Sequence, residues 1–261
     1  MKILFVGDIY GSDGRRAASE IIKPLREEYG IDLCIANGEN TAGGRGLTRN
    51  LLGKLRSYGV DVVTSGNHIW DNRDIIYEFD NNPDCRVIRP ANYPEGNPGK
   101  GSYIFTGIDE TKAGVMNLQG RVYMFPIDCP FRKADKLIEQ IKKKTPIIIA
   151  DFHAEATSEK IALGHYLDGR VTAVLGTHTH VMTDDACILP NGTAYITDAG
   201  MTGSRNSVIG VKKDIIIRKF LYESPVKYEP ASGDTIFCGV IIEADPETGK
   251  ALDIQKISIE C

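Results

Sequence analysis

Apolar residues in the first part of the chain fall into short blocks separated by longer amphipathic stretches. The blocks Lys2–Val6, Leu33–Asn37 and Val60–Thr64 predict short buried strands. Apolar residues with helical spacing predict helices over Arg16–Tyr29 and Thr48–Tyr58, and a glycine follows each of them. Strands that alternate with helices indicate a parallel sheet that is covered on both faces.

The rest of the chain adds further α/β elements and then a run of strands. The predicted elements are strands over Tyr103–Ile108 and Ala113–Leu118, a helix over Lys133–Lys144, and strands over Pro146–Asp151 and Ala173–Leu175. After Ser204 the alternation becomes that of antiparallel strands, over Ile215–Tyr222, Thr235–Ala244 and Ile254–Ile259. The pattern therefore predicts one α/β domain, residues 1–261, that is built on two sheets.

Composition limits the partners and the environment that we expect. The 261 residues are 42% hydrophobic and 25% charged, as in ordinary globular proteins, and the net charge is −4. Such a surface neutralises a nucleic-acid backbone poorly, so we expect no stable nucleic-acid complex. The six cysteines form no C-x-x-C pair, and no apolar stretch resembles a signal peptide or a membrane span. We expect reduced thiols, a cytoplasmic location and no membrane association.

Polar side chains with metal-binding atoms directly follow five of the predicted strands. They are Asp8, Glu39, Asn40, Asn67, His68, His153, His178 and His180. In open α/β sheets, ligands bind beyond the carboxyl ends of the strands, so we expect these groups to meet at one rim. A mixture of imidazole, carboxylate and amide donors suits iron, manganese or zinc.

Each of these segments is also compatible with a purely structural role. Gly7-Asp8 and Gly38-Glu39-Asn40 are typical of turns, and His153 alone could be a hydrogen-bonded core histidine. The His178-x-His180 pair is more specific, because residues i and i+2 of an extended segment point the same way with Cα atoms about 6–7 Å apart. That spacing fits two ions roughly 3.5–4 Å apart. The remaining histidine, His165, lies in a predicted helix and is expected to be a packing or surface residue.

The order of these segments resembles the signature of the calcineurin-like metallophosphoesterase superfamily. The matching segments are Gly7-Asp8, Gly38-Glu39-Asn40, Gly66-Asn67-His68, His153 and Gly176-x-His178-x-His180. Tyr10 stands where the superfamily usually has a histidine ligand, and Glu39, followed by Asn40, replaces the usual bridging aspartate. These departures are similar to the bacterial YmdB-like phosphodiesterases, which are associated with 2′,3′-cyclic nucleotides. The likeness extends from end to end and includes the segment Thr197–Gly203.

The resemblance implies a calcineurin-like fold, with two packed mixed β-sheets flanked by helices, and a dinuclear metal site. It implies iron as the metal, with manganese as the alternative. It assigns Asp8, Glu39, Asn40 and His180 to the first ion, and Glu39, Asn67, His153 and His178 to the second. Glu39 would then bridge the ions, and Asn40 would supply the neutral donor that is missing at position 10.

The charges of the implied ligands favour the binding of a phosphate ester. Asp8 and Glu39 are the only charged ligands, so two metal ions would leave the site positive by about two or more charges. Such ions make a bridging hydroxide available near neutral pH, and this hydroxide would attack phosphorus in line with the leaving oxygen. The resemblance makes His68 the proton donor, and an imidazole suits that role. A structural hydrogen-bonding role for His68 is the alternative.

Two further residues are candidates for supporting roles. Arg45 lies between glycines and would contact a phosphate, because the guanidinium group suits phosphate geometry. An ordinary surface loop is the alternative. Asp198 would orient a metal-ligand histidine, or would lie in a plain turn.

The sequence therefore predicts an enzyme, a dinuclear-metal phosphodiesterase that acts on small cyclic nucleotides such as 2′,3′-cyclic AMP. Two alternatives remain open. The same site would serve phosphomonoesters or RNA ends, or the protein would be a regulator that binds a partner with little turnover. The last predicted strand, Ile254–Ile259, is also compatible with pairing between copies of the chain in a homo-oligomer.

Overall fold

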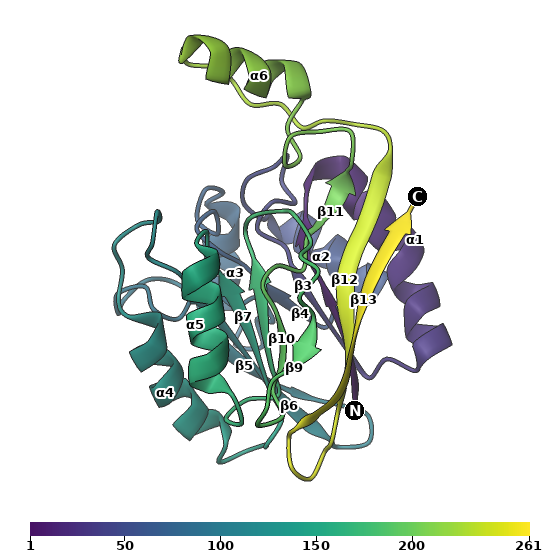
Figure 1. Ribbon diagram of the computed structural model, residues 1–261, viewed down its shortest axis with the longest axis vertical. Helices are drawn as coiled ribbons and strands as arrows, with labels where there is room; N and C mark the ends of the chain where they lie inside the picture. Colours follow the sequence, from purple (N-terminus) through teal and green to yellow (C-terminus); the bar gives the residue numbers. More distant parts are fainter.

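The computed structural model describes residues 1–261 as two β-sheets that face each other between helices (Figure 1). The first sheet contains β1 (Lys2–Val6), β2 (Asp8–Ile9), β3 (Leu33–Asn37), β4 (Val62–Thr64), β11 (Met201–Ser204), β12 (Thr235–Ala244) and β13 (Ala251–Glu260). The second contains β5 (Ser102–Thr106), β6 (Lys112–Gln119), β7 (Ile148–His153), β8 (Ala173–Thr177), β9 (Cys187–Ile188) and β10 (Ala194–Ile196). The helices are α1 (Gly11–Tyr29), α2 (Arg49–Tyr58), α3 (Asp74–Asn81), α4 (Pro130–Ile141), α5 (Thr157–Leu167) and α6 (Lys213–Tyr222).

The second sheet has a parallel centre with antiparallel margins. In the first sheet the antiparallel strand β12 separates the parallel strands β1, β3 and β4 from the parallel pair β11 and β2. The first has the order β2-β11-β12-β1-β3-β4, with β13 against β12, and its strands β1, β3 and β4 run parallel. The second has the order β5-β6-β7-β8-β10-β9, and its strands β6, β7, β8 and β10 run parallel. The parallel strands are those with continuous apolar sequences, as expected for strands that are buried on both faces.

The two faces of the first sheet pack against different layers. Ile3 and Phe5 of β1 belong to the apolar cluster between the sheets, which also contains Ile149 of β7. Leu4 and Val6 point the opposite way and pack with residues of α1 and α2. Helices α4 and α5 cover the outer face of the second sheet (Figure 1). This packing brings the carboxyl ends of the parallel strands of both sheets to one rim.

Helix α1 begins at Gly11, earlier than the predicted start at Arg16. Its first turn contains glycines, which intrinsically disfavour helix and hid this start in the sequence. Close packing explains the glycine at position 14, because a Cβ atom there would lie 2.2 Å from the carbonyl oxygen of Thr202. The first turn of α1 therefore lies directly against β11.

The strand predicted over Ile215–Tyr222 is wrong, because these residues belong to helix α6. A strand needs a partner for its backbone groups, whereas a helix satisfies most of them internally. Helix α6 projects beyond the ends of both sheets, and its backbone pairs with no strand (Figure 1). Asp214 in its first turn and Lys219 in its last turn also suit the helix dipole.

None of these helices combines the length and the apolar character that a membrane span needs. All six cysteines are free thiols, and Cys34, Cys85 and Cys238 are buried.

Candidate metal centre

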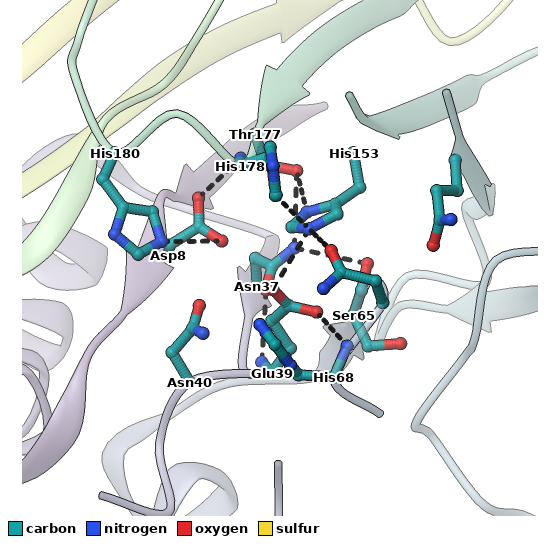
Figure 2. A network of polar contacts seen from close by, with 12 residues as sticks. Asp8, Asn37, Glu39, Asn40, Ser65, His68, His153, Thr177, His178 and His180 are labelled. Atoms are coloured by element: carbon teal, nitrogen blue, oxygen red, sulfur yellow. Dashed lines mark hydrogen bonds and ion pairs between the residues drawn. The ribbon is translucent and has the colours of Figure 1, made fainter. Parts of the chain in front are cut away.

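The polar side chains that follow the predicted strands come together where the two sheets meet (Figure 2). The first sheet contributes Asp8 in β2, Glu39 and Asn40 after β3, and Asn67 and His68 after β4. The second sheet contributes His153 at the end of β7, and His178 and His180 after β8. Neither sheet alone supplies the whole group.

One side of the group carries buried oxygen atoms that lack a hydrogen-bond donor. Asp8 and Asn40 are 0% and 3% exposed, and Asp8 Oδ1 and Asn40 Oδ1 have no donor. His180 Nε2 lies 3.8 Å from Asp8 Oδ1. His180 Nδ1 lies 2.8 Å from the carbonyl oxygen of Ile209, which can only accept a hydrogen, so Nε2 is the acceptor whenever the ring is neutral. Buried acceptors without donors are unfavourable unless a cation balances them, so these residues fit a metal ion.

On the other side, ligand atoms converge on Nε2 of His153. That nitrogen lies 3.1 Å from Glu39 Oε1, 3.1 Å from Asn67 Oδ1 and 3.0 Å from His178 Nδ1. The ligand atoms of Glu39, His153 and His178 all lie within 4.8 Å of one another. Carboxylate, amide and imidazole atoms so close together form a suitable donor set for a second cation.

Burial and mutual contact shift the pKa values of these groups. Burial raises the pKa of Asp8, although the histidines partly offset the effect. Burial also opposes charge on His153 and Glu39, but their ion pair outweighs it and moves the pKa of His153 to about 9 and that of Glu39 to about 2. Burial, together with the charge on His153, lowers the pKa of His178 to about 3. A neutral His178 is the form that binds metals.

A buried chain of hydrogen bonds orients His153. Thr177 Oγ1 donates to Asp151 Oδ1 at 2.7 Å, so it accepts from His153 Nδ1 at 2.9 Å. Nε2 therefore faces Glu39, and it is the ring nitrogen that can hold either a proton or a metal ion. Asn37 Nδ2 supports Asp151 from the other side by donating to Oδ2 at 3.1 Å. Such partners of metal ligands fix ring orientation and tune affinity.

These supporting residues were not predicted, although the sequence contains a signal for one of them. Asp151 precedes His153 by two positions in β7 and so lies on the same face of the strand. Gly66 has a related packing role, because a Cβ atom on it would lie 2.2 Å from Cδ2 of His153. A glycine is therefore required where the segment after β4 passes over the imidazole.

His178 and His180 lie in a tight turn, and the prediction that they belong to an extended segment is wrong. Their φ angles are +101° and +65°, in the left-handed region. The turn is held by Asp198, which accepts from the backbone N–H and the hydroxyl of Thr179 at 3.1 and 2.8 Å. The two rings consequently face different partners, His153 and Asp8 respectively.

Asp198 supports this turn without contacting a histidine ring, which corrects the predicted partner. Its other donors are the backbone N–H of Gly200 at 2.9 Å and the ammonium group of Lys160 at 2.7 Å. Lys160 and Asp198 are almost completely buried, so the charge on each is stabilised by the charge on the other. Asp198 thus supports the positions of His178 and His180 through the backbone of the turn.

His68 lies beside the proposed ligands rather than among them. Its backbone N–H donates to Glu39 Oε2 at 3.0 Å, and its Nδ1 lies 2.8 Å from Asp71 Oδ2. The ring lines a cavity of about 330 Å³ together with Glu39 and Asn40. Because Asp71 holds Nδ1, Nε2 is the nitrogen that remains for a ligand.

Arg45 lines the same cavity, whereas His165 does not. The guanidinium carbon of Arg45 lies 5.9 Å from the centre of the Tyr228 ring. His165 is exposed on α5, as expected for a surface histidine. Tyr10 packs edge-to-face on His180 with ring centres 5.6 Å apart.

Comparison with known proteins finds close relatives over the full length. A family model described as YmdB-like protein matches residues 4–257. The chain is 48% identical over 259 residues to a Bacillus subtilis protein named 2′,3′-cyclic-nucleotide 2′-phosphodiesterase, and the match covers 99% of this chain and 97% of the relative.

Solved structures agree with this relationship. A hypothetical protein from Thermus thermophilus superposes with a TM-score of 0.93 at 42% identity, over 100% of this chain and 99% of the other. A protein described as a novel phosphatase from Mycoplasma pneumoniae superposes with a TM-score of 0.92 at 36% identity, over 100% and 93% of the two chains. The predicted fold, two packed mixed sheets flanked by helices in the calcineurin-like arrangement, is confirmed.

Proposed function

This chain belongs to the YmdB-like protein family, and on that premise we propose that it is a metal-dependent phosphodiesterase that hydrolyses the 2′ ester of 2′,3′-cyclic nucleotides such as 2′,3′-cyclic AMP. The observation that carries the proposal is the meeting of seven donor side chains, among which Asp8 Oδ1 and Asn40 Oδ1 are buried without a hydrogen-bond donor. The name of the Bacillus relative supports the substrate class.

Two ions would be held at the rim by residues of both sheets. The proposed ligands are Asp8, Glu39, Asn40 and His180 for the first ion, and Glu39, Asn67, His153 and His178 for the second. The mixed oxygen and nitrogen donors suit iron, which we propose as the metal, with manganese as the alternative. When bound, the ions would offset the charge of the phosphate and make a water molecule nucleophilic near neutral pH.

His68 would donate the proton to the leaving 2′ oxygen. A ribose alkoxide is a poor leaving group, so its departure needs an acid within hydrogen-bond reach. His68 lines the cavity beside Glu39 and Asn40, and Asp71 keeps its Nδ1 engaged, so Nε2 is the donor atom. Asp71 is a positioning residue in this scheme, because it acts through the ring.

Turnover and metal content, measured on the same samples, test the proposal. Metal-loaded protein is expected to release adenosine 3′-phosphate from 2′,3′-cyclic AMP, to stop when the metal is removed, and to recover with iron or manganese. Glu39→Ala is expected to lose metal and turnover together. His165→Ala, which removes an exposed histidine far from the rim, is expected to keep both. Unchanged metal content in Glu39→Ala would contradict the ligand assignment.

A pair of chromogenic substrates separates a diesterase from a monoesterase. The phosphatase description of the Mycoplasma relative makes this comparison necessary. We expect hydrolysis of bis(4-nitrophenyl) phosphate and little hydrolysis of 4-nitrophenyl phosphate by the same preparation. The opposite preference would replace the proposed activity with that of a phosphomonoesterase.

A further inference from the structure

A second cavity of about 450 Å³ adjoins the one at the metal centre. It lies between the glycine-rich loop Gly43–Arg45 and the segment Val226–Tyr228. Four residues line both cavities: Tyr10, Gly44, Arg45 and Tyr228. Because they share these walls, the two cavities form one elongated site, of which only the first part contains proposed metal ligands.

The first cavity is lined by proposed metal ligands, so the part of the substrate that does not react needs an adjoining space. That cavity has a volume of about 330 Å³. Its lining includes Glu39, Asn40, His178 and His180, so two ions and a phosphate would occupy it. The nucleoside is attached to this phosphate through the ribose, so it must extend into an adjoining space. Small-molecule sites typically enclose about 300–1,000 Å³, a range that the second cavity satisfies by itself.

The walls of the second cavity have the chemistry of a site for a planar heteroaromatic group. The Tyr228 ring is 40% exposed, and the guanidinium group of Arg45 lies over it at 5.9 Å. Exposed aromatic rings and guanidinium planes are the surfaces on which proteins stack nucleobases. Lys227 adds a hydrogen-bond donor to the cavity, and Val226 adds an apolar wall.

The loop that carries Arg45 is fixed to the metal centre. Gly43, Gly44 and Gly46 have φ angles of +65°, +96° and +78°, which glycine adopts without strain. Asn40 Nδ2 donates to the carbonyl oxygen of Gly44 at 3.0 Å, and Gly44 N–H donates to the carbonyl oxygen of Asn40 at 3.0 Å. A Cβ atom on Gly44 would lie 2.5 Å from the Tyr10 hydroxyl. Arg45 is therefore held at the boundary between the two cavities.

We infer that the second cavity binds the nucleobase of the substrate, with Tyr228 as the residue on which the base stacks. This inference rests on the proposed function, because it assigns a place to the part of the cyclic nucleotide that does not react. Tyr228 is then a specificity-determining residue, which distinguishes nucleotides from other cyclic phosphodiesters.

Two cyclic phosphodiesters, one with a base and one without, test the inference. Tyr228→Ala is expected to lower kcat/KM for 2′,3′-cyclic AMP by roughly tenfold or more, through KM, because a stacked base loses its aromatic partner. The variant is expected to leave kcat/KM unchanged for glycerol 1,2-cyclic phosphate, which has the reacting group but no base. Tyr228→Phe keeps the aromatic ring and should hydrolyse both substrates as well as the unsubstituted protein does.

Tyr77→Ala serves as the matched control. Tyr77 is also an exposed tyrosine under an arginine, with Arg49 at 4.3 Å from its ring centre, but it lies on α3 and lines neither cavity. It should leave both substrates unaffected. An equal loss on both substrates in Tyr228→Ala, or no loss on either, would overturn the inference. If the original protein hydrolyses neither substrate, the proposed function itself fails, and that outcome is separate.

Discussion

Three of the four histidines at the rim are held in place through Nδ1 of the ring. Nδ1 of His180 contacts the Ile209 carbonyl oxygen, that of His153 contacts Thr177, and that of His68 contacts Asp71. His178 differs, because its Nδ1 faces His153 while its Nε2 lies 3.2 Å from Glu155. We therefore expect Nδ1 of His178, and Nε2 of His153 and His180, to be the metal-binding atoms.

Metal binding should release a proton from His153. Its pKa is about 9 in the metal-free protein, so the ring is charged at about pH 7.5, whereas a metal ligand must be neutral. Metal affinity should accordingly rise by roughly tenfold per pH unit towards about pH 9 and level off above it. Calorimetric titrations near neutral pH in buffers of different ionisation enthalpy would count the protons released. Affinity that is independent of pH between about 6 and 9 would contradict the ion pair with Glu39.

Loss of the proton donor should affect poor leaving groups most. His68→Ala is expected to keep its metal and to lose roughly 10²–10⁴-fold in kcat on 2′,3′-cyclic AMP. The loss on bis(4-nitrophenyl) phosphate should be much smaller, because 4-nitrophenolate departs without a proton. Steady-state kinetics on both substrates and metal analysis would measure this.

Asp71→Asn provides the companion measurement. This variant should show the same dependence on the leaving group with a smaller loss, since the ring remains and only its orientation is weakened. Metal loss in His68→Ala would show that His68 is a ligand, and equal losses on the two substrates would remove it from proton transfer.

The rim residues were predictable only as a set, because side chains with metal-binding atoms follow five separate strands, whereas each segment alone is also typical of a turn or a core residue. Asp151 and Thr177 were not predicted, because they lie within buried strands. The spacing of Asp151 from His153 is a signal in the sequence, but only the fold shows that Thr177 links the two side chains. Tyr228 was also missed. It reaches the site from a segment after α6, and no local pattern indicates that this segment returns to the metal centre.

Among the secondary-structure elements, α6 shows where local sequence is ambiguous. Its run of isoleucines favours a strand by propensity, and its apolar residues do not form one clean stripe. Only Ile216 is buried, against Tyr10, Met201 and Val211. The parallel strands were predictable because short continuous apolar segments indicate buried strands. Helix α6 makes few tertiary contacts, and its sequence alone does not decide between helix and strand.

Adjacent isoleucines of α6 allow a matched test of this contact. Ile216 is 7% exposed, and Ile217 is 54% exposed. Ile216→Ala is expected to lower the free energy of unfolding by about 2 kcal/mol, because it leaves a gap beneath Tyr10. Ile217→Ala should change it by less than about 0.5 kcal/mol. Urea denaturation of both variants would show the difference, and equal effects would mean that α6 is not anchored through Ile216.

At the scale of the whole molecule, the candidate metal centre lies across the junction of the two sheets. The general plan of two sheets between helices could be predicted from the alternation of strands and helices. The strand order could not, because β12 and β11 join the first sheet from far along the chain. Cations at the rim would tie the sheets together, since Asp8 and Glu39 come from one and His153 and His178 from the other.

Metal loading should therefore stabilise the entire fold. A metal present at about a thousand times its Kd and bound only by folded protein adds about 4 kcal/mol, which corresponds to a rise in Tm of about 10 °C. Scanning calorimetry of metal-free and metal-loaded protein would measure the shift. Glu39→Gln should abolish most of it, and a full shift in that variant would mean that the stabilising ions bind elsewhere.

The position of β12 has a consequence for how the protein is made. Lys2–Val6 of β1 pair with β12, and Gly7 N–H, next to the proposed ligand Asp8, donates to the carbonyl oxygen of Cys238 at 3.0 Å. When synthesis has reached His180, the chain contains every proposed ligand but lacks both β11, which pairs with Asp8, and β12, which pairs with β1. A chain that ends before β12 would contain all the proposed ligands without the strand that holds β1, so we expect the proposed centre to form only near the end of synthesis.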